Sequence, residues 1–298
     1  MKNGVIIVFK EKGMTSFGVV ARLRRIFNQK KIGHTGTLDP DAEGVLPVCL
    51  GRATRLVEDL SHGTKTYRAV LLLGRETDTQ DVSGKTLREY PVDVSPEEVK
   101  EAILSFSGKV QQLPPMYSAL KVNGKKLVDL ARKGIEVERK NREVEFSRFV
   151  ISDISLPRVT FEVTCSHGAY IRTLCHDIGA KLGCGGCMES LLRTEVEGFC
   201  LSDALTLSQI EERVLKGDTD FVMAPDRFYR DLPAATVKES WLRPTLNGRA
   251  VPLRKLSEAD ISGESIRLYA PDGSFIGIYR KEGTDFLLLK YYYEGEDV

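Results

Sequence analysis

The chain has 298 residues, 42% of them hydrophobic, which is enough apolar material for one large domain with a smaller one beside it. Its formal net charge is only +1, yet residues 1–70 carry twelve Lys or Arg against six Asp or Glu, an excess typical of a phosphate-binding face or of a solvated basic helix. The apolar run at residues 5–9 is too short for a signal-peptide core or a membrane span, so we expect neither secretion nor membrane insertion, and a cytoplasmic location.

The first predicted elements are a strand at residues 5–9 and a helix that Thr15 or Ser16 caps. Apolar residues at helical spacing predict this helix, namely Val19, Val20, Leu23, Ile26 and Phe27. A second strand is predicted at residues 67–73. Ser95, Pro96 and Glu98 then supply a capping hydroxyl, a proline at the first helical position and a reciprocal carboxylate, which predict a helix through Phe106.

Residues 159–165 alternate between apolar and polar side chains, as expected of a half-buried antiparallel strand. Strands and helices are interspersed along the chain without a strict βαβ rhythm. The pattern therefore predicts an α+β fold, with a mixed, largely antiparallel sheet and flanking helices.

The six cysteines are expected to be reduced thiols, because nothing indicates an oxidising compartment. Cys184 and Cys187 have half the spacing of a zinc site, with His176 upstream, but no second ligand pair follows. We expect no metal, and a zinc or thiol-redox protein remains an alternative.

Beyond residue 232 the chain becomes richer in proline, and short alternating runs at residues 265–270 and 275–279 flank Pro271, Asp272 and Gly273. This is a hairpin signature. With residues 286–293 it predicts a small β-rich C-terminal domain, either an accessory binding module or simple packing cover.

The most unusual segment is residues 33–47, GHTGTLDPDAEGVLP, with three glycines, two prolines, one histidine and three carboxylates. Pro40 keeps Asp39 out of the helical region and stiffens the turn, so this loop can hold a side chain still. Taken alone, the spacing equally describes a tight connection in which Asp39 makes a turn to its own backbone.

The segment GHTGTLDP followed by AEGVLP resembles the catalytic signature of the TruB-type tRNA pseudouridine-55 synthases. The resemblance covers nearly the whole chain, because further family segments follow in the same order: KTYR at 65–68, GRETDTQD at 74–81, PPMYSALK at 114–121 and YIRTL at 170–174. It implies a stand-alone enzyme of bacterial type that isomerises one T-loop uridine of tRNA to pseudouridine after flipping it out of the loop.

The resemblance also implies roles for particular residues, by position in the motifs. Asp39 matches the family's nucleophile, Tyr67 the tyrosine beneath the target base, and Arg172 the arginine paired with the aspartate. Substrate-binding positions follow in the same way, with a histidine that fills the vacated stack, an apolar contact for the flipped base and basic contacts to phosphates: His34, Tyr170, Leu191, Arg55 and Lys121. His62 and His167 are interpreted as loop histidines without a special role.

Pseudouridylation breaks the bond from ribose to N1 and rejoins uracil through C5, so it requires no redox cofactor and no metal, and we expect none. An ionised carboxylate supplies the reacting oxygen. A nearby guanidinium opposes the rise in pKa that burial imposes on a carboxyl, which is a physical reason for Arg172. Whether Asp39 attacks the base, attacks the sugar or promotes a glycal route stays open at this level.

The predicted organisation is a catalytic domain at residues 1–232, with a T-loop-binding insertion at about 112–145, and a domain similar to the PUA type at 233–298. Further basic residues are expected to follow RNA phosphates, namely Arg22, Arg25, Arg52, Lys125, Lys126, Arg132 and Lys133. The expected partner is the T-arm of tRNA, and the chain is expected to be a monomer without an obligate protein partner. Two alternatives keep the fold, a non-catalytic RNA chaperone and a guide-RNA-dependent relative that modifies ribosomal RNA.

Overall fold

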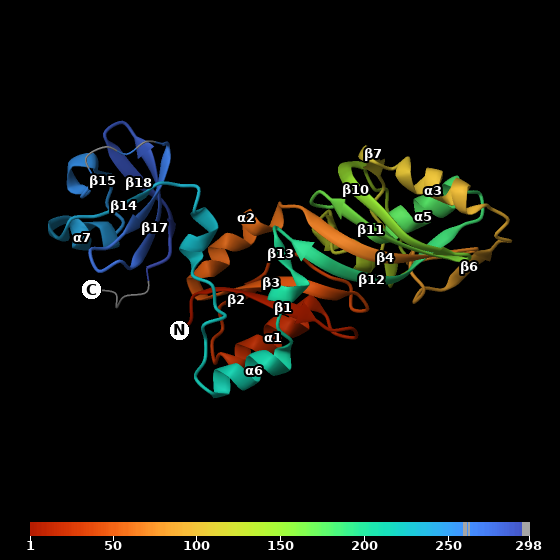
Figure 1. Ribbon diagram of the computed structural model, residues 1–298, viewed down its shortest axis with the longest axis horizontal. Helices are drawn as coiled ribbons and strands as arrows, with labels where there is room; N and C mark the ends of the chain where they lie inside the picture. The colour runs from red at the N-terminus through yellow and green to blue at the C-terminus, as the bar shows by residue number, and fades with distance from the viewer. Residues whose placement is uncertain (259–260, 262, 294–298) are drawn as a thin grey trace.

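The computed structural model describes residues 1–258, 261 and 263–293. These residues form a large mixed sheet and a smaller C-terminal sheet, which lie at different ends of an elongated molecule (Figure 1). The expected α+β class, with a mixed and largely antiparallel sheet, is confirmed. Within the described residues, no helix is both long enough and apolar enough to cross a bilayer.

The large sheet is antiparallel except where β3 and β12 run parallel. Its order is β1 (Gly4–Lys10), β3 (Glu43–Leu50), β12 (Gly186–Val196), β4 (Lys65–Leu73), β11 (Arg158–Cys165), β10 (Arg142–Ser155) and β7 (Gly108–Gln112), with β2 (Ile32–His34) paired to β3 and β13 (Phe199–Cys200) paired to β12. The parallel pairing aligns Gly44 with Arg193. It therefore fixes the end of the 33–47 loop against the middle of the sheet.

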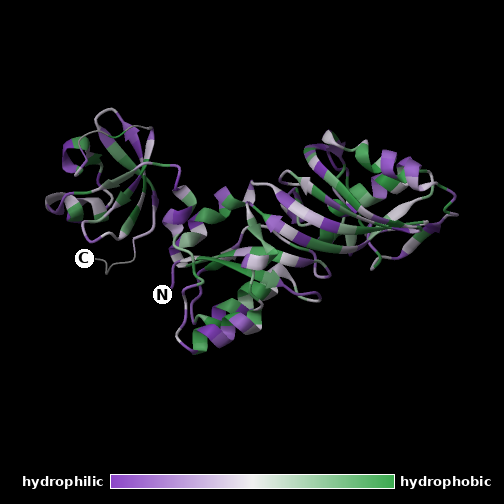
Figure 2. Cartoon of the chain, in the orientation of Figure 1, coloured by the Kyte–Doolittle hydropathy of each residue, from purple (hydrophilic) through white to green (hydrophobic). Residues whose placement is uncertain are grey.

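Two pairs of helices cover different parts of this sheet (Figure 1). Helices α1 (Ser16–Ile26) and α6 (Leu207–Leu215) pack against β1 and β3 through one apolar cluster, whereas α3 (Pro96–Leu104) and α5 (Ile171–Lys181) cover the β4, β11 and β10 region through another. Figure 2 shows the hydrophobic residues concentrated on the central strands, while α1 and α6 carry both hydrophobic and hydrophilic residues. This amphipathic pattern is the reason that the helices adhere to the sheet by one face.

Local sequence explains where these helices begin. The hydroxyl of Thr15 accepts from the amide of Gly18 at 2.9 Å and caps α1. Ser95 and Glu98 form the expected capping box at the start of α3. The predicted end of α3 at Phe106 was wrong: the helix stops at Leu104, since the chain must turn into β7 at Gly108, whose φ is +94°.

The C-terminal sheet contains the predicted hairpin. Its order is β14 (Ala234–Thr236), β16 (Ser265–Tyr269), β17 (Phe275–Glu282), β18 (Asp285–Tyr291) and β15 (Val251–Pro252), with α7 (Glu239–Leu246) packed into the same apolar cluster. Residues 259, 260, 262 and 294–298 of the expected 233–298 domain lie outside the described residues.

This sheet docks on the short elements η1 (Gly51–Leu56) and α2 (Val57–Ser61). Asp59 accepts hydrogen bonds from Lys290 and from the hydroxyl of Tyr229. Tyr292 is buried in an apolar cluster shared by both sheets. The junction thus combines apolar packing with a carboxylate that joins the two parts of the chain.

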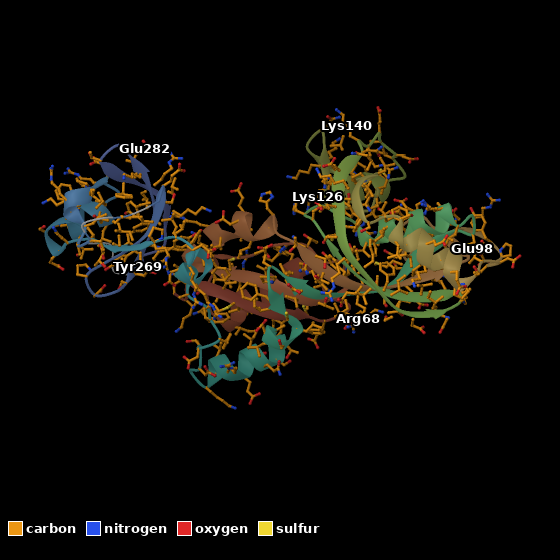
Figure 3. The ribbon with its side chains drawn as sticks, turned by 45° about the horizontal axis from the view of Figure 1, so that its top comes forward. Arg68, Glu98, Lys126, Lys140, Tyr269 and Glu282 are labelled. Carbon is orange, nitrogen blue, oxygen red and sulfur yellow. The ribbon has the colours of Figure 1, made fainter. Side chains whose placement is uncertain are left out.

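The remaining elements are short. They are β5 (Arg75–Thr77), β6 (Thr86–Glu89), β8 (Lys121–Val122), β9 (Lys125–Lys126), α4 (Leu127–Ala131), η2 (Leu201–Asp203), η3 (Pro225–Tyr229) and η4 (Leu253–Lys255). The pairs β5–β6 and β8–β9 form two small sheets of two strands each. Figure 3 shows Lys126 and Lys140 on the segment that stands out from one edge of the molecule.

Candidate active site

A pocket of about 310 Å³ opens where the 33–47 loop meets strands β4 and β12 and the start of α5. Its walls come from segments far apart in sequence, among them residues 36–39, 118–120 and 165–172. The lining side chains that matter for the chemistry are Asp39, Tyr67, His167, Arg172, Leu191 and Arg193.

The loop that carries Asp39 is held on both sides by buried polar groups. The hydroxyl of Ser16 accepts from the amide of Leu38 at 2.9 Å, and the ammonium of Lys10 donates to the carbonyls of Pro40 at 3.0 Å and Ala42 at 2.6 Å. Lys10 is fully buried, and burial lowers its pKa, although nearby carboxylates oppose this. The backbone on either side of Asp39 is therefore fixed before any substrate arrives.

Gly44 shows why the loop needs a glycine where it joins β3. Its φ is +111°, and a Cβ on it would lie 2.1 Å from the carbonyl oxygen of Arg193. Only a residue without a side chain permits this approach of β3 to β12. The same contact brings the loop to the strand that carries Leu191 and Arg193.

Arg172 holds the Asp39 carboxylate with two nitrogens. Its Nε lies 3.0 Å from Oδ2, and its Nη2 donates to Oδ1 at 3.3 Å. The guanidinium also contacts Asp81 at 3.4 Å and donates to the carbonyls of Thr79 at 2.9 Å and Tyr117 at 2.7 Å. Arg172 is 5% exposed, and this set of partners fixes the orientation of the carboxylate.

The Asp39 side chain remains 39% exposed toward the cavity, although its surroundings are largely desolvated. Burial raises the pKa of Asp39 above its ordinary value, the Arg172 guanidinium opposes that rise, and the neighbouring Asp81 carboxylate adds to it. The arrangement is a carboxylate with a tuned proton affinity and a fixed direction, which suits nucleophilic chemistry.

Tyr67 and Arg193 form the floor of the pocket. They are paired residues in the β4–β12 register, and the Arg193 guanidinium lies close enough to the tyrosine hydroxyl to affect its pKa. Burial raises the pKa of Tyr67, and Arg193 opposes the rise. Arg193 is 1% exposed and donates to the carbonyls of Val45 at 2.6 Å and Gly36 at 3.3 Å, so it ties the floor to the catalytic loop.

Tyr170 and Leu191 also line the pocket, as expected. The backbone of Tyr170 is clamped by Gln112, whose side chain donates to its carbonyl at 3.0 Å and accepts from its amide at 2.8 Å. This clamp sets the start of α5, and with it the position of Arg172. Leu191 supplies an apolar wall on β12.

Three expected substrate-binding residues lie outside the pocket wall. His34 is on β2, half-buried, and burial lowers its pKa. Arg55 is at the junction with the C-terminal sheet, where it donates to the carbonyl of Tyr291 at 2.7 Å. Lys121 is exposed on the β8–β9 hairpin, next to the lining residue Leu120.

The basic residues expected to follow phosphates fall into two sets. Arg22 pairs with Glu211 at 2.5 Å, and Arg52 donates to the carbonyl of Tyr293, so both already contact groups of the protein. Five of the expected residues lie in the 112–145 segment, and within the described part of the chain their exposed side chains have no hydrogen-bond or ion-pair partner: Lys121, Lys125, Lys126, Arg132 and Lys133.

Sequence reasoning missed several groups that the structure places at the site. His167 is an exposed residue of a turn, as expected of a loop histidine, and it also lines the pocket, with its ring 5.1 Å from that of His62. Asp81 stood in a motif but received no role. Arg193 lies in β12 among several polar residues, and only the structure shows that it is the one buried charge there, which must have partners.

Cys184 and Cys187 are buried free thiols. Burial raises the pKa of Cys187 to about 11. A raised thiol pKa disfavours the thiolate that zinc binding or thiol exchange requires. The described residues contain no group of three or more His, Cys, Asp or Glu suited to hold a metal ion.

Comparison with known proteins gives two family matches. Residues 24–171 match the model described as TruB family pseudouridylate synthase (N terminal domain), and residues 172–245 match that of the tRNA pseudouridylate synthase B C-terminal domain. The chain is 47% identical to tRNA pseudouridine synthase B of Alkaliphilus oremlandii over 84% of this chain and 83% of that protein. It is 40% identical to the protein of the same name from Clostridium kluyveri, over 97% of this chain and 99% of that protein.

Solved structures share the fold. A Cbf5-Nop10-Gar1 complex gives a TM-score of 0.70 at 25% identity over 97% of this chain and 84% of that chain. An H/ACA RNP bound to a substrate RNA containing 2'-deoxyuridine gives a TM-score of 0.69 at 23% identity, over 99% of this chain and 86% of that chain. Together, the fold, the pocket and these matches define the class of protein, a pseudouridine synthase.

Within that class, the chain belongs to the TruB family. The family expectation drawn from the motifs is therefore confirmed, as is the expectation of an isomerase that acts without adding or removing atoms.

Proposed function

We propose that this chain converts the uridine at position 55, in the T-loop of tRNA, to pseudouridine, with Asp39 as the nucleophile. The observation that carries the proposal is the Asp39 carboxylate, held by two nitrogens of a buried arginine and directed into a pocket of about 310 Å³. A cavity of this size accommodates one flipped nucleoside. The names of the curated relatives supply the substrate class, tRNA.

In the proposed reaction the bond between C1′ and N1 of the nucleotide breaks, the uracil turns within the pocket, and a bond forms between C1′ and C5. The proton on C5 leaves, and N1 becomes protonated, so atoms and charge balance. Asp39 supplies the reacting oxygen and Arg172 keeps it ionised and oriented. Tyr67 and Leu191 hold the flipped base between an aromatic ring and an apolar side chain.

The other proposed contacts lie around this pocket. His34 fills the stack that the uridine vacates, and Tyr170 borders the ribose side of the pocket. Arg55 and Lys121, which lie outside the wall, contact the RNA backbone beyond the target nucleotide.

We further propose that residues 1–232 are the catalytic domain, that about 112–145 grip the T-loop, and that 233–298 are an RNA-binding domain similar to the PUA type. The exposed, unpartnered cations of the 112–145 segment support its role in RNA binding. We also propose that the chain works as a monomer without an obligate protein partner. We place the activity in the cytoplasm, where tRNA is the available substrate.

The experiment is tritium release from T-arm RNA labelled at C5 of uracil, with wild-type protein and Asp39→Asn. We expect release by the wild type and a loss of at least about 10⁴-fold in the variant, the size seen when a nucleophile is removed. Circular dichroism shows whether the variant is folded. Equal release by both proteins would show that Asp39 is not the nucleophile, whereas tight RNA binding with no release by either would favour the chaperone alternative.

A further inference from the structure

Opposite Asp39, one rim of the pocket carries an accumulation of basic side chains. His167 and Arg142 line this rim, and the His62 ring lies 5.1 Å from the His167 ring at an interplanar angle of 60°. Lys65, on β4, lines the wall below them. These residues come from three separate segments, around residues 62–65, at residue 142 and at residue 167, so only the fold brings them together.

Lys65 and Arg142 differ in whether their side chains already have partners in the protein. Lys65 donates to the carbonyls of Ser61 and Gly63, both at 2.9 Å, and so fixes the turn that carries His62. Within the described residues, the guanidinium of Arg142 has no hydrogen-bond or ion-pair partner. A Cβ on Gly168 would lie 2.9 Å from the Nη1 of this guanidinium. Arg142 thus presents an uncompensated guanidinium directly beside His167.

The His167 imidazole stands in a field that disfavours its protonation. Burial lowers the pKa of His167, and Lys65, His62 and Arg142 lower it further, against an opposing hydrogen bond to the Ser61 backbone. The charged or titratable groups packed around His167 are Lys65, His62, Arg142, Tyr170, Glu145 on the neighbouring β10 and Glu197, which lies against Gly63. An arriving anion reverses this balance, since it attracts every cation of the cluster.

We propose that Arg142, His62 and His167 form a binding site for one phosphate of the RNA backbone next to the target uridine, and that His167 takes up a proton as the phosphate arrives. The proposal rests on the proposed function and deepens it, because it assigns the group that positions the flipped nucleotide by its backbone. Arg142 supplies a permanent charge with a fork of donors. His62 supplies a further ring N–H donor, and His167 supplies a charge that exists only in the complex.

The sign of the pH effect follows from this coupling. Phosphate binding raises the pKa of His167, so the RNA binds more tightly as pH falls through the titration range of that imidazole. Between about pH 8 and about pH 6 we expect Kd for T-arm RNA to fall about tenfold, the effect of one charge-assisted hydrogen bond.

The test measures Kd for a T-arm RNA by fluorescence anisotropy across this pH range, in Asp39→Asn protein so that the RNA is not turned over. Adding His62→Gln and His167→Gln to this protein should give weak binding, with a high Kd that does not depend on pH. Adding His167→Lys instead should give tight binding, with a low Kd that depends much less on pH, because the lysine stays charged across this range. His176→Gln, a change on α5 outside this pocket, is the matched control and should keep the parent profile.

A parent profile that is flat, or that persists unchanged after the double histidine substitution, overturns the proposal. So does His167→Lys if it binds as weakly as the glutamine variant at about pH 8. Because binding is measured apart from turnover, these results are distinct from failure of the proposed isomerase activity, which the tritium experiment reports.

Discussion

The catalytic pocket and the 112–145 segment use charged residues in opposite ways. In the pocket, Lys10, Arg172 and Arg193 are each at most 5% exposed, and every one has several partners. In the 112–145 segment the lysines are exposed and unpartnered within the described residues. Buried charges must be paired and therefore orient chemistry, whereas exposed ones remain available to RNA phosphates.

The strongest test of this comparison is Arg172→Gln. Removing the guanidinium leaves Asp39 without its ion-pair partner and close to the Asp81 carboxylate, so we expect the free energy of unfolding to fall by about 3–5 kcal/mol and kcat/KM to fall at least about a hundredfold. Urea unfolding and tritium release measure the two effects.

The matched control is Arg158→Gln, which removes an arginine that also contacts a carboxylate with two nitrogens, that of Glu189, but at 56% exposure. An exposed pair contributes at most about 1 kcal/mol. Equal destabilisation by both changes would contradict the distinction between buried and exposed charges.

The fall of kcat/KM at low pH, the acid limb of the pH profile, tests whether the pKa of Asp39 is raised. Because the pKa of Asp39 is raised and the ionised form reacts, kcat/KM should fall about tenfold per pH unit below that pKa. Arg172 opposes the rise, so Arg172→Gln should move the limb to higher pH. In Asp218→Asn, which alters a carboxylate paired with Arg213 away from the pocket, the limb should stay in place.

The exposed side of the comparison is tested by Lys125→Ala combined with Lys126→Ala. We expect KM for tRNA to rise about fivefold and kcat to stay unchanged. The slope of log KM against log salt concentration should fall by about 1.5. Lys216→Ala, which removes an exposed lysine paired with Glu212, is the control. A fall in kcat with unchanged KM would mean that these lysines act on the chemistry.

The smallest expected effect is that of Ser95→Ala at the start of α3. Loss of the capping box should cost about 1 kcal/mol of stability and leave kcat and KM unchanged. Thermal unfolding and tritium release measure this, and any change in kcat would show that α3 transmits strain to the pocket.

The sequence by itself determined the local structure of this protein, because capping, periodicity and turn chemistry act between near neighbours. Thr15, Ser95 and the turn around Gly273 each appear where their residue types require them. The motifs also identified the family, since they recur in order along the chain. The end of α3 was the local feature that the sequence did not predict, as it depends on where β7 enters the sheet.

Only the tertiary structure decided which charged groups meet. Arg172 and Asp39 are 133 residues apart, and the pairing expected from the family motif acquires its geometry from the start of α5, which Gln112 clamps. Asp81, Arg193 and His167 reach the site through sheet register and loop packing, for which no local pattern exists. The physical reason is that burial and the electric field at a side chain depend on everything packed around it, and sequence neighbours supply only a small part of that surrounding.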